Sequence, residues 1–196
     1  MKKYYAFLFL AGFLNMCLVP SASAQAVAAR ASVEDFLNSI KDVQKVNRAN
    51  AYLDLEVISQ KALGDHWPSA SEEQKQTFLA LLQALIEKVA YPQSRKFLDN
   101  LPIEYKDPTP LEKGVEVATV VKNQEEGLDA PIVYQLYEAE GNWKIYDILL
   151  DGVALTEDFK FQFDTIIRES SFDGLLDRMR ERLAAAEKEA EAAPAN

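Results

Sequence analysis

Few residues of this chain have the types and spacing that catalysis or metal binding requires. The 196 residues include one cysteine, Cys17, and one histidine, His66. Zinc fingers, disulfide frameworks, Cys/His proteases and His-rich metal centres all need more of these residues, so we expect no metal and no cofactor. The chain also lacks a Gly-x-Ser-x-Gly turn for a nucleophilic serine and a glycine-rich loop for phosphates. A single histidine in a loop is usually solvated, so His66 receives no catalytic role.

Asp147 is the one carboxylate whose position suggests chemistry. It lies inside an apolar run, and strict strand alternation places it on the same side as Ile145 and Leu149. Because a buried carboxylate is costly unless it is paired, we expect a structural ion pair, with Lys160 or Arg168 as candidate partners. An acid–base role for an unpaired Asp147 is the alternative.

The composition is that of an acidic globular protein. Hydrophobic residues make up 48% of the chain, and 21 Lys and Arg face 31 Asp and Glu, a net charge of −10. Phosphate backbones and anionic bilayers both select basic surfaces, so we expect neither nucleic-acid binding nor electrostatic adsorption to a membrane.

The N-terminus has the pattern of a secretory signal. Lys2 and Lys3 precede an apolar run over 4–19, and Ala22-Ser23-Ala24 provides the small residues of a cleavage site. We therefore predict a signal peptide over 1–24, cleaved after Ala24, which leaves 19 basic and 31 acidic residues and a net charge of −12. A single domain is predicted over 25–183, and the Ala/Glu-rich 184–196 is predicted to be a flexible tail.

The spacing of apolar residues predicts helices, then strands, then helices. After a mobile lead over 25–31, Ser32 is expected to cap a first helix, a second ends at Gly64, and 66–68 form a loop. A Ser71–Gln74 capping box opens the clearest helix, which Tyr91-Pro92 should interrupt. Period-two runs predict strands over 103–106, 115–122, 132–138 and 143–150, and helices follow from 155.

These elements define an α+β fold: a twisted, mostly antiparallel sheet of about four strands, wrapped by N- and C-terminal helices. The last two strands are apolar on both faces, so something must cover each side. Periodicity does not separate a filled core from an apolar cavity between the sheet and the helices, and both remain open at this point.

Several strings resemble the MlaC family, also called the toluene-tolerance auxiliary family. The segment 63–67 with the following 71–78 resembles the family's Leu-Gly-x-x-Trp segment and its next helix. The strings 141–148 and 151–155 are similar to its central Gly-x-Trp-Lys-Val-Tyr-Asp-Val…Glu-Gly-Val-Ser-Leu signature, and 162–176 to its closing helices. The resemblance covers about 32–183, nearly all of the chain that follows the predicted signal.

The resemblance implies a soluble, non-enzymatic periplasmic carrier of phospholipid or another two-chain lipid. Members pass lipid between an outer-membrane lipoprotein–porin complex and the lipid-binding subunit of an inner-membrane ABC transporter, and we expect a monomer. Ala154 stands where the family has serine, and Phe159-Lys160 where it commonly has Tyr-Arg. These departures affect polar contacts near a lipid headgroup and are compatible with another lipid cargo.

On this interpretation an apolar cleft holds the acyl chains. The strand and helix residues that we predict to line it are Leu82, Leu85, Val89, Val117, Thr119, Val121, Val133, Tyr137, Ile145, Ile148, Leu150, Val153, Phe159 and Phe163. Because both sheet faces are apolar, the face that points into the cleft is left open.

Two other functions remain as alternatives. A small hydrolase or isomerase would carry an unpaired Asp147 at the floor of a cavity. A periplasmic interaction or assembly factor would have a filled core and an exposed apolar groove. The lipid class, the number of acyl chains and the direction of transport are not encoded in any motif that we recognise.

Overall fold

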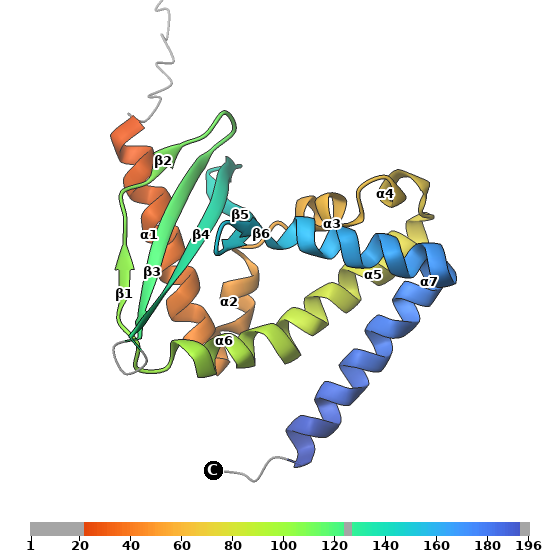
Figure 1. Cartoon of the computed structure of the whole chain (residues 1–196). Helices are drawn as coiled ribbons and strands as arrows, with labels where there is room; N and C mark the ends of the chain where they lie inside the picture. Colours follow the sequence, from red (N-terminus) through yellow and green to blue (C-terminus); the bar gives the residue numbers. More distant parts are fainter. Residues whose placement is uncertain (1–21, 124–126, 193–196) are drawn as a thin grey trace, which may run out of the picture.

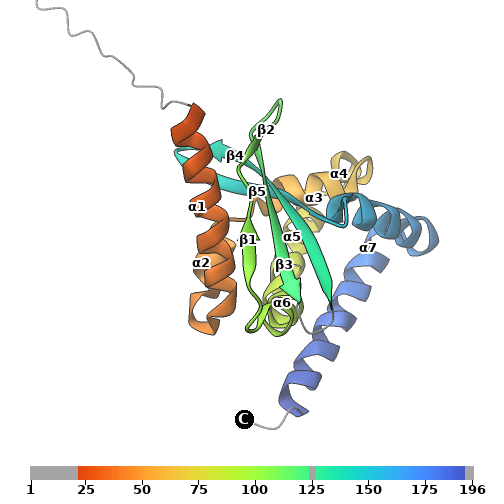
Figure 2. The same cartoon turned by 60° about the vertical axis from the view of Figure 1, so that its left-hand side comes forward.

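The computed structural model describes residues 22–123 and 127–192. An antiparallel sheet carries helix α1 on one face, and a second body made of helices lies beside the sheet (Figures 1 and 2). The predicted α+β class is therefore confirmed. Nearly all of the predicted signal peptide lies outside the described residues, so its cleavage stays a prediction.

The sheet has the order β1-β3-β4-β5-β6, with β2 also paired to β3, and every pairing is antiparallel. The four predicted strands are present, and two strands of two residues each are added. The strands are β1 (Ile103–Tyr105), β2 (Thr109–Pro110), β3 (Val115–Asn123), β4 (Leu128–Ala139), β5 (Asn142–Leu150) and β6 (Val153–Ala154).

The helices fall before and after the sheet. They are α1 (Ala22–Lys41), the 3-10 turn η1 (Val43–Lys45), α2 (Val46–Asn50), α3 (Leu55–Leu63), α4 (His66–Ser69), α5 (Glu72–Leu85), the π-helical turn η2 (Ile86–Ala90), α6 (Tyr91–Leu98) and α7 (Leu155–Ala192). No helix within 22–123 or 127–192 combines the length and the apolar character that crossing a bilayer requires.

One face of the sheet, called here the α1 face, packs against α1. Phe36 of α1 lies edge-on to Tyr134 of β4 with 6.2 Å between ring centroids. Tyr134 pairs with Val117 of β3 and Ile148 of β5, so these side chains share the α1 face. We call this core, which also includes Val33, the first cluster. The opposite side of the sheet is called the back face.

A β-bulge changes the face of the residues on β5. Asp147 pairs with Gln135, whereas Ile145 pairs with Leu136, and the register shifts between the two pairs. Neighbouring residues of β4 point to opposite faces, so Asp147 and Ile145 do as well. The prediction that Asp147 shares a side with Ile145 is therefore wrong, because alternation assumes a regular strand. Its shared side with Leu149, which pairs with Val133, is correct.

Helix α1 begins earlier than predicted. Residues 25–31 are helical rather than a mobile lead, and Ala29 is fully buried. The Ser32 hydroxyl donates to the Ala28 carbonyl, four residues back, as a side chain inside a helix does, so Ser32 is not an N-cap. Small residues predicted mobility here, but they allow α1 to pack closely against the sheet.

The capping box that opens α5 is confirmed. Ser71 accepts from the Gln74 amide, and the Gln74 side chain accepts from the Ser71 amide. The predicted interruption at Tyr91-Pro92 is wrong, because η2 widens the helix just before Pro92 and the chain continues into α6. The segment 66–68 is also not a loop, because it forms the short helix α4. Gly64 ends α3 as predicted, with a φ of 51°.

A second core joins α3, α5 and α7. Phe78 and Leu63 are among its fully buried side chains, and we call this core the second cluster. Leu55, Ile58 and Ile86 pack against both clusters. The two cores therefore meet along α3 and η2, which is where the helical body adjoins the sheet.

Helix α7 is sharply bent near its middle, as Figure 1 shows, at Ser171. Ser171 has φ 74° and ψ 172°, a region that only glycine occupies without strain. Its Oγ accepts from the Gly174 amide at 3.4 Å, so it also caps the second half of α7. The helix continues to Ala192, past the predicted domain end at 183, and Ala186 is buried.

The strain at Ser171 gives a testable prediction. Ser171→Gly should raise the free energy of unfolding by about 1 kcal/mol, because relief of strain exceeds the few tenths lost when glycine replaces a serine cap. Ser171→Ala keeps the strain and loses the cap, so it should lower stability instead. Urea unfolding of both variants checks this, and equal effects would contradict it.

Candidate functional site

The fourteen side chains predicted to line a cleft do not lie together. Five of them are sealed with 0–8% exposure: Val117, Val121 and Ile145 in the first cluster, Leu82 in the second, and Thr119 on β3 between Val117 and Val121. The Thr119 hydroxyl donates to the Ile132 carbonyl at 3.1 Å, which satisfies the polar group in this core. These five residues therefore pack against protein rather than facing an open space.

Two others, Val133 and Tyr137, lie on the back face. The Tyr137 hydroxyl donates to the Asp54 carboxylate, and its ring lies 5.9 Å from that of Tyr146. The hydrogen bond to Asp54 raises the pKa of Tyr137 to about 12, with desolvation adding to the effect. Because the sheet separates these two from the residues of the α1 face, the fourteen do not line one compartment.

The raised pKa of Tyr137 predicts a pH dependence. Its folded-state pKa lies above the unfolded value near 10, so its contribution to stability is complete below about pH 10 and is lost as the pH rises toward 12. Tyr137→Phe should therefore reduce the loss of stability over that interval. Urea unfolding at about pH 9 and 11 measures it, and an unchanged pH slope would contradict the account.

Three more predicted residues, Ile148, Leu150 and Val153, belong to a part of the α1 face that its helices leave uncovered. Ile132, which is not one of the fourteen, pairs with Leu150, and Leu150 pairs with Val153, across β4, β5 and β6. Ile132 is partly buried, whereas Leu150 is 43% and Val153 56% exposed. With Ile148 in the neighbouring row, we call these four residues the open edge. It is an apolar sheet surface without a complete cover.

The last four predicted residues, Leu85, Val89, Phe159 and Phe163, lie on α5, η2 and α7, and all are partly buried. Phe159 stacks on Phe163 with 5.6 Å between ring centroids, and Phe163 meets Phe78 edge-on. We call these four the helical wall. Because α7 begins at Leu155, directly after β6, the wall and the open edge adjoin in the chain at that point.

Asp147 is buried and fully engaged. It forms an ion pair with Lys61 of α3, and it accepts from the Thr156 hydroxyl at 2.6 Å and from the amides of Ile148 and Thr156 at 3.0 and 3.3 Å. Lys61 also lies over the Tyr146 ring, 4.9 Å from its centroid. The predicted structural ion pair is confirmed.

The predicted partners of Asp147, Lys160 and Arg168, are wrong. Lys61 precedes Asp147 by 86 residues, and the bulge turns the carboxylate toward α3. No strand or helix period relates two such positions. The network joins α3, β5 and the first turn of α7, so Asp147 holds the helical body against the sheet.

The other polar groups considered for chemistry, His66 and its neighbours, are engaged in surface ion pairs and hydrogen bonds. His66 pairs with Asp164 of α7 at 2.9 Å, and Arg168 bonds the same carboxylate. The hydrogen bond from His66 is the main reason that the pKa of Asp164 lies below its ordinary value. Over the described parts of the chain, no three His, Cys, Asp or Glu side chains gather as metal ligands would.

Two surface pockets of about 450 and 480 Å³ are present, and neither contains any of the fourteen predicted residues. The larger is bounded by Ser32 and Arg48 on one side and by Tyr52 and Trp143 on the other. The smaller lies where α1 and α6 end.

Comparison with known proteins identifies the family to which this chain belongs. The sequence profile described as "MlaC protein" matches residues 25–181, which is most of the chain. The chain belongs to the MlaC family. The resemblance drawn from the strings around Trp67, Trp143 and Asp151 is therefore confirmed.

Two relatives define the similarity further. The intermembrane phospholipid transport system binding protein MlaC of Haemophilus influenzae is 28% identical over 134 residues, which are 66% of this chain and 62% of that protein. The alignment thus spans about three fifths of that relative's length. A phospholipid-binding protein from Ralstonia solanacearum, solved with a phospholipid, superposes with a TM-score of 0.69 at 24% identity, over 83% of this chain and 98% of that one. This likeness shows that the two chains share a fold.

Proposed function

We propose that this MlaC-family chain is a non-enzymatic periplasmic carrier that moves phospholipid, or a related two-chain lipid, between membrane complexes. The family match over residues 25–181 is the observation that carries the proposal. The shared fold with a protein that was solved holding a phospholipid supports it. The phospholipid transport system named for the Haemophilus relative supports a role between membranes.

The acyl chains, on this proposal, lie between the open edge and the helical wall. Both surfaces are apolar and incompletely buried, and side chains that pack against both clusters lie where the helical body adjoins the sheet. Each methylene removed from water contributes about 0.8 kcal/mol, so exposing a 16-carbon chain would cost on the order of 12 kcal/mol. A carrier that crosses water must therefore cover its cargo, and both surfaces have apolar area left with which to do so.

The surroundings of Asp147 favour a carrier over the hydrolase or isomerase alternative. A general acid or base needs a lone pair or proton directed at substrate, but the Asp147 carboxylate is occupied by Lys61, Thr156 and Ile148.

Loading and unloading are assigned to protein partners, namely an outer-membrane lipoprotein–porin complex and the lipid-binding subunit of an inner-membrane ABC transporter. The acidic charge supports this assignment, because it disfavours direct adsorption to anionic bilayers.

Uptake of a fluorescent phospholipid tests the proposal. The delipidated exported protein should take a pyrene-acyl phospholipid from vesicles and shield the pyrene from iodide, with saturation at a fixed molar ratio. Pyrene that stays in the vesicles or remains open to iodide would contradict it. The protein alone should exchange lipid between vesicles slowly. Fast exchange without any partner protein would contradict the proposal that docking controls loading and unloading.

A further inference from the structure

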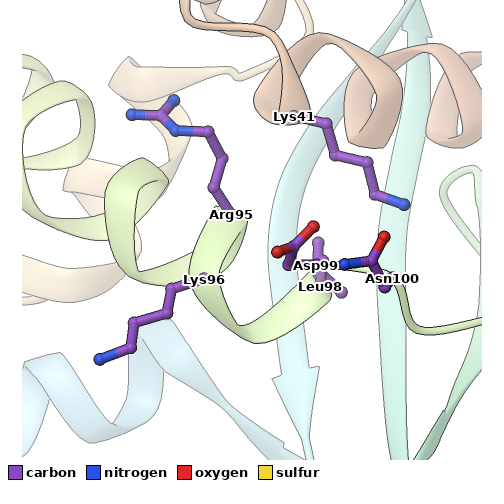
Figure 3. Close-up of a pocket in the computed structure, with 6 residues that line it drawn as sticks. All are labelled: Lys41, Arg95, Lys96, Leu98, Asp99 and Asn100. Carbon is purple, nitrogen blue, oxygen red and sulfur yellow. The ribbon is translucent and has the colours of Figure 1, made fainter. Parts of the chain in front are cut away.

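A pocket at the C-terminal ends of α1 and α6 is separate from the proposed lipid groove, which is the space between the open edge and the helical wall. Its volume is about 450 Å³, and Figure 3 shows the six residues that line it: Lys41 from the end of α1, and Arg95, Lys96, Leu98, Asp99 and Asn100 from the end of α6 and the segment after it. Leu98 is buried in the first cluster, whereas Lys41 and Lys96 are exposed. The pocket thus has one buried apolar residue, Leu98, and a rim of charged and polar side chains.

The rim is positive in a protein that is otherwise acidic. Three cations and one carboxylate line the pocket, and the whole chain has a net charge of −10. Arg95 donates to the Ile40 carbonyl at 3.1 Å and is thereby fixed between α6 and α1. Within 22–123 and 127–192, no ion pair involves Lys41, Lys96 or Asp99. The two lysine ammonium groups are therefore available to contact a ligand.

Helix electrostatics explain part of this arrangement. Cations in the last turn of a helix interact favourably with its carbonyl end, and Lys41, Arg95 and Lys96 all occupy such turns. That stabilisation does not require a hollow between the two helix ends. It also does not account for Phe97, the residue after Lys96 in α6, which is 46% exposed. Aromatic residues and arginine are enriched at protein-binding surfaces, and α6 carries both Arg95 and Phe97.

The directions of the side chains indicate which kind of anion fits. In Figure 3 the Lys41 ammonium, the Arg95 guanidinium and the Lys96 ammonium point away from one another. One phosphate cannot touch three groups that diverge, so the geometry disfavours a small anion or a single headgroup. Carboxylates spaced along a peptide can meet such groups one after another.

We propose that this pocket docks an acidic segment of a protein partner. The inference deepens the proposed function, because a lipid carrier must be oriented against the complex that loads it. The net acidic charge repels acidic surfaces generally, so a local cationic patch would select one orientation for docking. Such a contact is exposed, and it should weaken as salt screens it.

Titration of the lipid-loaded, ¹⁵N-labelled exported protein with a hexaglutamate peptide tests the proposal. We expect amide shifts grouped at residues 41 and 95–100, which fade when NaCl rises from about 0.05 to 0.5 M. Lys96→Glu should weaken binding at least about threefold, in line with the loss and reversal of an exposed charge pair. Lys188→Glu is the matched control, because Lys188 is an exposed residue of α7 and the substitution makes the same change in net charge. It should leave binding unchanged.

Several outcomes would overturn the proposal. Absence of grouped shifts would leave the cations with a helix-end role only. Equal effects of the two lysine variants would mean that net charge alone drives binding. The same shifts with inorganic phosphate would indicate a small-anion site, and shifts that grow with protein concentration alone would indicate a second copy as occupant. Because lipid uptake is measured without the peptide, failure of this proposal and failure of the carrier function are distinguishable.

Discussion

Asp147→Ala is expected to lower the free energy of unfolding by about 3 kcal/mol, because it removes the acceptor of a buried network. The Ile148 and Thr156 amides and the Thr156 hydroxyl lose their partner, and Thr156 and Asp147 are only 2% exposed. Lys61 is partly exposed and can return to water, so the cost comes mainly from the buried donors. Urea unfolding followed by circular dichroism measures the change.

A partner variant and a surface control separate this explanation from a general effect of lost charge. Lys61→Met keeps the Thr156 and Ile148 hydrogen bonds but leaves the buried Asp147 carboxylate without its counter-ion, so it should also lower stability. Asp164→Ala removes a surface carboxylate that is also paired, with His66 and Arg168, and should change stability little. If Asp147→Ala were no more costly than Asp164→Ala, Asp147 would not hold the helical body to the sheet.

Leu150→Trp is expected to reduce lipid occupancy while the fold is retained. Leu150 is 43% exposed on the open edge, so a larger ring fits the sheet but occupies space assigned to an acyl chain. Displacing about two methylenes costs about 1.6 kcal/mol, roughly fifteenfold in affinity. Lipid extracted from the purified variant and counted against protein measures the effect.

Val43→Trp is the matched control for that substitution. Val43 lies in η1 and is 67% exposed, so it gains the same ring outside the proposed groove. Its lipid content should equal that of the unchanged protein. Equal lipid content in Leu150→Trp, at unchanged stability, would place the acyl chains elsewhere than between the open edge and the helical wall.

The sequence predicted the regular parts of this fold well, because period and capping are local properties. The helix of α5 follows from Ser71 and Gln74, and the strands follow from alternation such as that of Val117, Thr119 and Val121. The family strings around Trp143 predicted the remainder of the architecture. What local patterns could not give were the departures from regularity: the bulge before Asp147 and the π-helical turn before Pro92.

The candidate site was predicted less well for a related reason. Apolar residues look alike in sequence whether they are sealed, as Val117 is, or left at an uncovered edge, as Leu150 is. The assignment of Lys61 to Asp147 depends on a contact across 86 residues. Ile132 was not among the predicted residues, although its pairing with Leu150 places it in the same row.

Native mass spectrometry of the protein purified from the periplasm tests the central claim most directly. The account predicts a complex heavier than the polypeptide by the mass of about one phospholipid, which organic extraction removes. Protein that arrives from that compartment consistently at the bare polypeptide mass, under conditions that preserve other lipid complexes, would contradict it.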